Sequence, residues 1–409
     1  MTKYNSNGEI EKFKSRVCID GSRVKLDISE TYEGIASTTC IRLLLCLCAR
    51  FKLHLVQTDI KNFFLQARLP EDKVYYTEIP NGWEQGKKGE NVAKVLAPWY
   101  GLPEAAKVAG QQYETVLVKN GMQSNPWMPK VFHMWDGDDF IACATHIDDS
   151  PWIATNMDKL KLLLRKIDKE FKLEITWNPT KLLGCDLEYD RSRGILKMHQ
   201  GSFCRDKFLT GRKFKPVRSP GYIPATIANP EAPSRDERQA TKDEIALFQN
   251  KIGNLMWTTK TDAGSMFAIQ RAATAMLNPQ KENWNEIARL ENYKATNPEI
   301  GLVFRAADPP EVLKPGQNLD CLTMFADADL GGCRQTAKSY SGWCAHLGGS
   351  GMFDFKTKKQ TCVAQSSCES ETNCNKAATC DVICSGVVYR LCPLLFLNQL
   401  QCAKIIVQR

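Results

Sequence analysis

Alternating and continuous apolar runs divide the first part of the chain into elements. An apolar run rich in leucine and cysteine predicts a largely buried helix over Ile35–Arg50. From Phe51 the pattern changes to strand-like alternation (HLVQTDI), which predicts a strand that ends near Asp59. Before these elements, Lys14–Ile19 (KSRVCI) is expected to form a short strand with basic residues on one face.

A hairpin is predicted in the middle of the chain. Two β-prone runs, Val131–Trp135 and Phe140–Ile147, flank the segment DGDD, which is a strong signal for a hairpin turn. The second run leaves Asp148 and Asp149 at its far end. Carboxylates at the end of a strand are held rigidly and face solvent, as a metal site requires. This strand end is therefore a candidate site.

Predicted elements alternate with proline-rich segments in the rest of the chain. An amphipathic helix is expected over Asn156–Phe171, because its leucines fall on one face and its basic residues on the other. The elements that follow are, in chain order, a hairpin of Lys181–Tyr189 and Ile195–His199, a linker over 215–244, a helical region over 243–297, a second linker over 306–318 and a strand that ends on Asp327-Ala328-Asp329.

Composition narrows the class of protein. The 409 residues suffice for two or three domains that each bury a core. Hydrophobic residues make up 43% and charged residues 24%, as in ordinary soluble globular proteins. No apolar run approaches the roughly 18 residues of a membrane span, and the N-terminus lacks the apolar segment of a secretory signal. We therefore interpret the 17 cysteines as reduced thiols of an intracellular protein.

Positive charge is concentrated in one segment. The net charge is +8, and between Pro151 and Lys215 fifteen Lys and Arg residues stand against eight Asp and Glu. Such a segment is either a solvated helix face or a surface that follows the backbone of a nucleic-acid duplex. Charge alone leaves both interpretations open.

The candidate chemistry lies in three aspartates. Asp59 and the pair Asp148–Asp149 lie about 90 residues apart, at the ends of different predicted strands. Two-metal phosphoryl transfer needs carboxylates from separate elements that hold two ions about 3.5–4 Å apart. An Asp-Asp dipeptide alone is more often a polar turn than a metal site. The sequence around it must therefore decide between these two interpretations.

That context is a resemblance that covers most of the chain. From about Lys14 to Val388 the sequence resembles the reverse transcriptase and ribonuclease H regions of copia-type (pseudoviral) retrotransposon polyproteins. The matching blocks follow the order of the family: KSRVCIDGS (14–22), TTCIRLLLCLCAR (38–50), VQTDIKNFFL (56–65), WYGLPEAAK (99–107), HIDD (146–149), KLLGCDLEYD (181–190), KIGNLMWTTKTDAG (251–264), FADADLGGCRQTAKSYSGWCAHLGG (325–349) and KTKKQTCVAQSSCESE (356–371). So many blocks in one order are far more specific than any single motif.

The resemblance implies an RNA-directed DNA polymerase that extends a primer from deoxynucleoside triphosphates (dNTPs) on an RNA or DNA template. Asp59 and Asp148 would be the main ligands of two Mg²⁺ ions, for which Mn²⁺ can substitute, and Asp149 would support them. Arg16 would contact the incoming triphosphate, or be a solvated strand residue. Phe64 stands where an aromatic ring excludes a ribose 2′-hydroxyl, and its alternative role is core packing.

In the C-terminal region the resemblance assigns Asp327 and Glu371 to the metal site of a ribonuclease H, where water attacks an RNA phosphodiester. Lys358 and Lys359 would contact the backbone of the hybrid, or lie in a solvated turn. Segment 393–409 carries no counterpart of the third ribonuclease H aspartate of the family. The sequence therefore favours polymerase activity over ribonuclease H activity.

The predicted fold class is α+β. A right-hand polymerase has its fingers and palm over 1–200 and a helical thumb or connection over 201–315, and a truncated ribonuclease H-like α/β domain follows over 316–409. The expected partners are template–primer nucleic acid, dNTPs and other parts of a Pol polyprotein, without a membrane. The expected location is a cytoplasmic particle that can have a nuclear phase.

Four residues depart from the family pattern near the expected polymerase site, one of which is Ala106, where the family has proline. His146 replaces the tyrosine of the YVDD motif, Glu104 stands where the family has glutamine, and Pro151 lies where the family continues a strand. A carboxylate near a triphosphate repels it unless the side chain turns away, and a proline cannot donate to a central ladder. The alternative function is therefore a decayed retroelement product that binds nucleic acid without catalysis.

Overall fold

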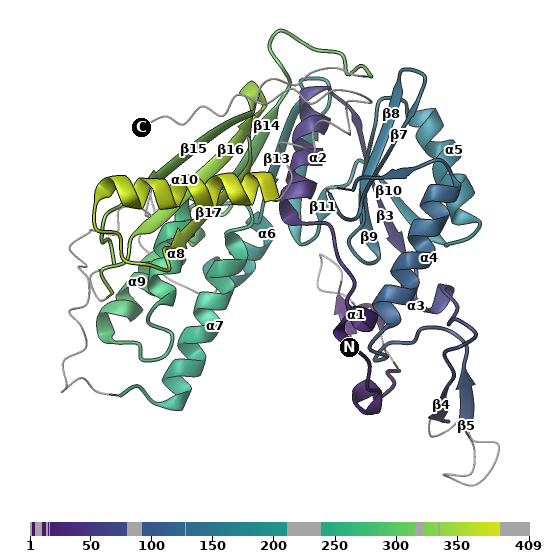
Figure 1. The fold of residues 1–409 in the computed structure, drawn as a ribbon, viewed down its shortest axis with the longest axis horizontal. Coiled ribbons are helices and arrows are strands. Elements are labelled where there is room, and N and C mark those ends of the chain that lie inside the picture. Colours follow the sequence, from purple (N-terminus) through teal and green to yellow (C-terminus); the bar gives the residue numbers. More distant parts are fainter. Residues whose placement is uncertain are drawn as a thin grey trace.

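The computed structural model mixes helices and strands, in agreement with the expected α+β class (Figure 1). Among the described residues, no helix combines the length and the apolar character that crossing a membrane requires. The described residues are 2–4, 10–13, 15, 17–79, 92–126, 128–210, 239–315, 322–333 and 336–384.

The largest sheet is antiparallel, with the strand order β10-β3-β9-β8-β7-β6. One of its faces is covered by α4 (Ala105–Lys119) and α5 (Met157–Asp168), and the other by α2 (Thr38–Arg50). The strands are β3 (His54–Ile60), β6 (Gln123–Ser124), β7 (Val131–Asp136), β8 (Asp139–Ala144), β9 (Asp149–Ala154) and β10 (Leu173–Trp177).

Two further sheets lie on the other side of α2 (Figure 1). The four-stranded sheet consists of β11 (Lys181–Leu182), β12 (Cys185–Asp190), β13 (Ile195–His199) and β14 (Gly301–Arg305). The three-stranded sheet consists of β15 (Leu322–Ala328), β16 (Tyr340–Leu347) and β17 (Met352–Lys359), and α10 (Ser367–Cys384) packs against it.

Helices and short elements complete the described chain. The expected helical region contains α7 (Lys242–Thr258), α8 (Met266–Ala273) and α9 (Lys281–Thr296), which pack around their own apolar core. The short elements are β1 (Thr2–Tyr4), β2 (Ile10–Phe13), α1 (Ile28–Thr31), α3 (Phe63–Gln66), β4 (Tyr75–Glu78), β5 (Val92–Val95) and α6 (Gly201–Cys204).

The buried helix predicted from the apolar run is α2. It begins at Thr38 rather than at Ile35, because Ser37 caps it by accepting a hydrogen bond from the backbone N–H of Cys40 (3.2 Å). Every residue from Cys40 to Arg50 is buried. Its apolar side chains belong to one core that also includes residues of β8, β13, β14 and β17. The helix therefore shares its core with strands of three sheets.

The strand predicted over Lys14–Ile19 is wrong for the residues that the structure describes there. The carbonyl of Val17 accepts a hydrogen bond from Trp99 Nε1 (2.9 Å), and the N–H of Ile19 donates to the carbonyl of Tyr100 (2.8 Å). Isolated bonds to one turn replace a strand ladder, so this segment runs along the turn as an irregular stretch.

The predicted strand Lys181–Tyr189 is also interrupted. Leu183 and Gly184 form a two-residue turn between β11 and β12, with φ of +48° and +78°. Positive φ at both central residues gives the primed turn whose twist matches that of paired strands. A leucine in the left-handed region is uncommon, which is why the sequence pattern concealed this turn.

The shared core predicts a strong effect of truncating α2. Replacement of the fully buried Leu44 by Ala should lower the free energy of unfolding by about 2–5 kcal/mol, because it leaves a cavity. Urea unfolding followed by tryptophan fluorescence measures this, and one transition should shift as a whole. The control Val118→Ala, on an exposed position of α4, should change it by less than about 0.5 kcal/mol. Two separate transitions, with only one affected, would contradict a shared core.

Candidate functional site

The central strands bring the three predicted aspartates to one end of the large sheet. Asp59, near the end of β3, lies directly opposite Asp149, the first residue of β9. Residues opposite each other in an antiparallel pair project from the same face of the sheet. Asp148 precedes Asp149 in the turn between β8 and β9, and its carbonyl accepts a hydrogen bond from the N–H of Ile60 (2.8 Å).

The two opposed carboxylates differ in environment. Asp59 is exposed, whereas Asp149 is half-buried and accepts a hydrogen bond from Gln57 Nε2 (2.7 Å). Burial raises the pKa of Asp149, the hydrogen bond from Gln57 opposes this rise, and the negative charge of Asp148 adds to it. The sequence analysis missed Gln57. Its position two residues before Asp59, on the same face of the strand, is the signal that identifies it.

The turn between β8 and β9 is tight and strained. His146 and Asp149 exchange two backbone hydrogen bonds of 2.9 and 3.2 Å, which leaves Ile147 and Asp148 as a two-residue loop. The strand before the loop therefore ends at Ala144, three residues earlier than predicted. Ile147 has φ of +61°, which is a genuine outlier for a β-branched residue. Such strain is concentrated at functional sites, where the surrounding structure maintains it.

The donor set suits a hard divalent cation. Two carboxylates share one face at the strand ends, and a third is in the adjoining turn. Within the described ranges no three Asp, Glu, His or Cys side chains already form a closed metal cage. Mg²⁺ is commonly held by one or two carboxylates together with substrate phosphates and water. The residues present therefore fit a magnesium site that substrate completes.

The other residues expected near this site have different outcomes. Arg16 lies outside the described residues. Phe64 is half-buried, and its ring contacts those of Phe63 and Tyr100, with centroids 5.6 and 5.0 Å away. Glu104 is only 2% exposed, so its side chain has turned inward, and in the described residues neither carboxylate oxygen has a hydrogen-bond partner.

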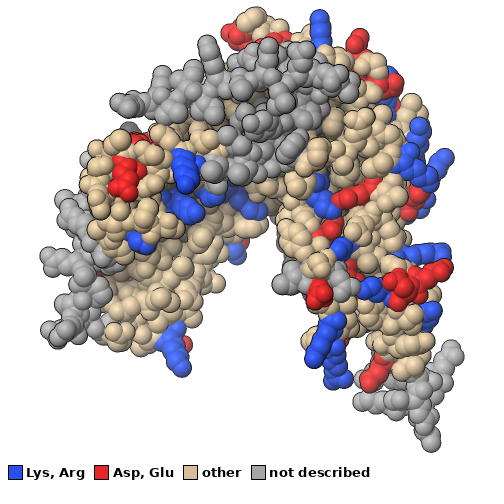
Figure 2. All heavy atoms as spheres, viewed as in Figure 1, with Lys and Arg blue, Asp and Glu red and all other residues tan. Residues whose placement is uncertain are grey.

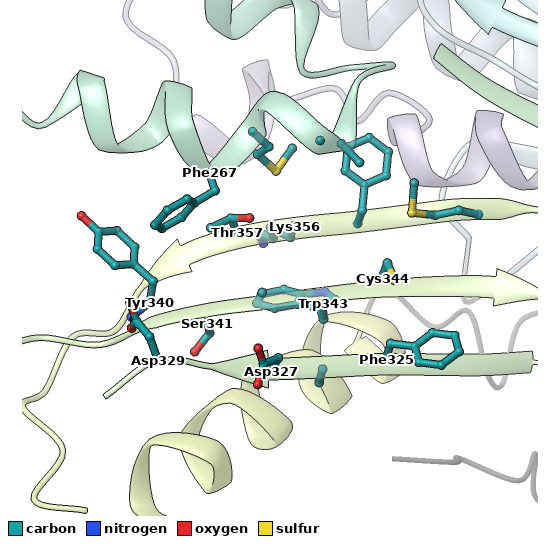
Figure 3. A pocket seen from close by; sticks show the side chains of 17 residues that line it. Phe267, Phe325, Asp327, Asp329, Tyr340, Ser341, Trp343, Cys344, Lys356 and Thr357 are labelled. Atoms are coloured by element: carbon teal, nitrogen blue, oxygen red, sulfur yellow. The ribbon is translucent and has the colours of Figure 1, made fainter. Parts of the chain in front are cut away.

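Glu371 lies beside the end of β15, the strand that carries Asp327. Glu371, on the first turns of α10, accepts a hydrogen bond from the N–H of Ala328, the neighbour of Asp327, over 3.4 Å. Asp327 lines a cavity of about 910 Å³ between α8 and the three-stranded sheet. Figure 3 shows Asp327 on β15, with Phe267 and Phe325 among the apolar side chains around the cavity.

The two lysines expected to contact a nucleic-acid backbone lie in β17, not in a turn. Lys358 is exposed, and Lys359 Nζ lies 3.7 Å from the thiol of Cys333. Their contact with a nucleic-acid backbone stays a prediction.

The basic segment after Pro151 does not form a uniform positive surface on the face that Figure 2 shows, where blue and red side chains are interspersed. Lys159 pairs with Asp136 (2.7 Å) and Asp139 (3.0 Å). Arg205 pairs similarly with Glu299 (2.9 Å). Part of the excess charge is therefore neutralised within the protein.

Comparison with known proteins gives a consistent family. The family described as reverse transcriptase (RNA-dependent DNA polymerase) matches residues 1–212. The chain is 24% identical over 378 residues to the retrovirus-related Pol polyprotein from transposon TNT 1-94 of Nicotiana tabacum, which covers 90% of this chain and 27% of that protein. It is 26% identical over 393 residues to the corresponding polyprotein from transposon RE2 of Arabidopsis thaliana, with 94% and 25% covered. The chain thus spans about a quarter of the length of these relatives.

The strained turn makes a prediction that reverses the usual order of two substitutions. Ile147→Gly should be more stable than Ile147→Ala by about 1 kcal/mol, because only glycine adopts positive φ without strain. At the exposed Leu162 of α5, used as the control, alanine should be the more stable by about 1 kcal/mol. Urea unfolding of the four variants measures both differences. The same order at both positions would show that Ile147 carries no strain.

Proposed function

This chain belongs to the reverse transcriptase (RNA-dependent DNA polymerase) family, with copia-type Pol polyproteins of plant transposons as relatives, and on this premise we propose that it extends a primer from dNTPs on an RNA or DNA template. One observation carries the proposal. Asp59 and Asp149 lie opposite each other on adjacent strands, with Asp148 in the turn beside them. Rigidly placed carboxylates from separate elements are what two-metal nucleotidyl transfer requires.

Asp59, Asp148 and Asp149 would hold two Mg²⁺ ions, or Mn²⁺ in their place. When bound, these ions supply charge that activates the 3′-hydroxyl of the primer and stabilises the leaving pyrophosphate. The protein keeps the carboxylates in position. Gln57 fixes one oxygen of Asp149, and the indole N–H of Trp152 donates to Thr58 Oγ1 (2.9 Å), which ties β9 to β3 behind the site.

The proposed assignment of regions follows the family. Residues 1–200 would form fingers and palm, 201–315 a thumb or connection, and 316–409 a ribonuclease H-like part. We place the template–primer in the deep hollow between the two lobes that Figure 2 shows, which α7 borders on one flank (Figure 1). Trp257 on α7 is 40% exposed, so it offers an aromatic surface to a duplex.

Ribonuclease H activity is not part of the proposal. Glu371 lies beside the strand that carries Asp327, but two carboxylates are fewer than the family uses, and the described residues add no third acidic ligand there. A site with fewer ligands holds its metal less tightly.

The proposal predicts the loss of activity on removal of one carboxylate charge. Asp148→Asn should lower Mg²⁺-dependent primer extension by about a hundredfold or more, because even partners of metal ligands contribute 10–100-fold. Incorporation of labelled dNTP into a template–primer measures this. The control Asp158→Asn, whose side chain is 88% exposed on α5, should leave the rate unchanged.

Two outcomes would contradict the polymerase function. Equal activity of Asp148→Asn and the unchanged protein would show that the carboxylate of Asp148 has no role in catalysis. Salt-sensitive binding of template–primer by the unchanged protein, without any incorporation, would establish the alternative function of a decayed, binding-only product.

A second prediction separates sugar discrimination from core packing at Phe64. Phe64→Val should raise the use of ribonucleotides relative to dNTPs by about tenfold or more, because the ring no longer occupies the space of a 2′-hydroxyl. Phe64→Tyr keeps a ring and should keep the discrimination. The ratio of kcat/KM for the two nucleotides measures the effect. If Phe64→Val lowers stability but leaves this ratio unchanged, the residue only packs the core.

A further inference from the structure

We propose that Lys260 binds a phosphate of the primer strand next to its 3′ end, and so positions the strand that is extended. This inference rests on the proposed polymerase function and adds a residue to it. Lys260 follows α7 and belongs to the helical region, far in sequence from the three aspartates.

The end of α7 packs against the turn between β11 and β12. A Cβ atom added to Gly184 would lie only 3.0 Å from Cζ2 of Trp257, so glycine allows the indole to approach the turn closely. This contact fixes the last turn of α7 beside the four-stranded sheet. Lys260, one residue beyond Thr259, is thereby held at a defined place.

Two contacts hold Lys260 itself. Its Nζ lies 3.5 Å from the centroid of the Trp257 ring, a cation–π arrangement that orients the ammonium. Its backbone carbonyl accepts a hydrogen bond from Nη2 of Arg42 (2.6 Å), a buried residue of α2. The side chain is therefore pre-organised, and little conformational entropy is lost when it meets an anion.

The ammonium of Lys260 lacks an acidic partner in the described part of the chain. Its pKa is lowered by burial, and no carboxylate is among the groups whose charge acts on it. Neighbouring lysines differ, because Lys251 pairs with Glu291 (2.7 Å) and Lys294 with Asp262 (2.6 Å). A half-buried cation without a counter-ion is poorly stabilised by the protein, and an anionic ligand would complete its environment.

Lys260 lies within electrostatic reach of the β8–β9 hairpin, which carries Asp148 and Asp149. Its positive charge acts on His146, the residue at which that hairpin begins its turn. Arg42, which holds the carbonyl of Lys260, belongs to α2, and α2 packs on the face of the large sheet from which Asp59 and Asp149 project. A phosphodiester of the strand that carries the reacting 3′-hydroxyl is an anion that would lie on this face of the sheet.

The position of Lys260 favours the primer strand, rather than the incoming triphosphate, as its ligand. Lys260 lies at the end of α7, which borders the hollow on one flank, whereas α3 with Phe64 lies on the side of β3 away from α7 (Figure 1). A dNTP discriminated by Phe64 would enter from that other side. The strand already paired with template then occupies the side of α7 and the turn at Gly184.

The test compares Lys260→Gln with Lys260→Arg in the full chain. Binding of a fluorescently labelled template–primer is measured by anisotropy over a range of salt concentrations, without Mg²⁺ or nucleotide. Lys260→Gln should raise Kd by about tenfold and lower the slope of log Kd against log salt by about 1, which is one lost phosphate contact. Lys260→Arg should restore both values. The control Lys281→Gln, at the exposed start of α9, should change neither.

A modified primer locates the contact. Three primers carry a neutral methylphosphonate at one of their last three linkages, and the Kd of each is measured for the unchanged protein and for Lys260→Gln. The difference in Kd between the two proteins should vanish for one of these linkages only. This result needs no catalysis, so it stands even if the polymerase function fails. An unchanged salt slope, an undiminished difference at every linkage, or a raised KM for dNTP with unaltered primer affinity would each overturn the inference.

Discussion

The arrangement of the described elements depends on one constraint, which is that α2 must be buried on every side. Its apolar residues fill a core shared by three sheets, but it also takes two arginines out of water. Burying a charge is unfavourable unless partners replace the water. Arg50 donates to Glu311 (2.7 Å) and Ser350 (3.0 Å), and Arg42 lies 3.7 Å from Asp354. The charged groups of one helix therefore fix where the C-terminal sheet lies.

The same constraint reaches the proposed site. Because α2 packs against β8 and β9, it supports the face of the sheet from which Asp59 and Asp149 project. Through Arg42 it also holds the carbonyl of Lys260. Burial lowers the pKa of Arg42 to about 10, so the guanidinium stays charged at neutral pH and keeps its role as a donor. Asp59, Asp149 and Lys260 are thus all supported by one rigid helix, α2. Such common support gives side chains that are distant in sequence a fixed geometry.

Local patterns predicted the parts of the site that local forces determine. Alternation predicted the strand that carries Asp59, and the turn chemistry of DGDD predicted the hairpin before Asp149. The register that sets these two residues opposite each other depends on pairing between distant strands, so no local pattern contains it. Leu183 adopts positive φ against its own preference, because the paired strands on either side impose it. Lys260 depends on contacts between three separate elements, and nothing in its own segment distinguishes it.

Pro151 tests whether the departures from the family pattern count against catalysis. It lies in β9, between β3 and β8, where a proline should break the ladder. The N–H and carbonyl of Asp149 bond to His146, on the side of β8. Because the backbone groups of successive residues point alternately to the two neighbouring strands, those of Pro151 also point to the side of β8. Pairing of β9 with β8 begins only at Trp152, so no ladder partner requires the missing N–H. Glu104 differs, because its side chain is buried and neither carboxylate oxygen has a hydrogen-bond partner among the described residues, which is unfavourable. Neither residue alters the pairing that sets Asp59 opposite Asp149.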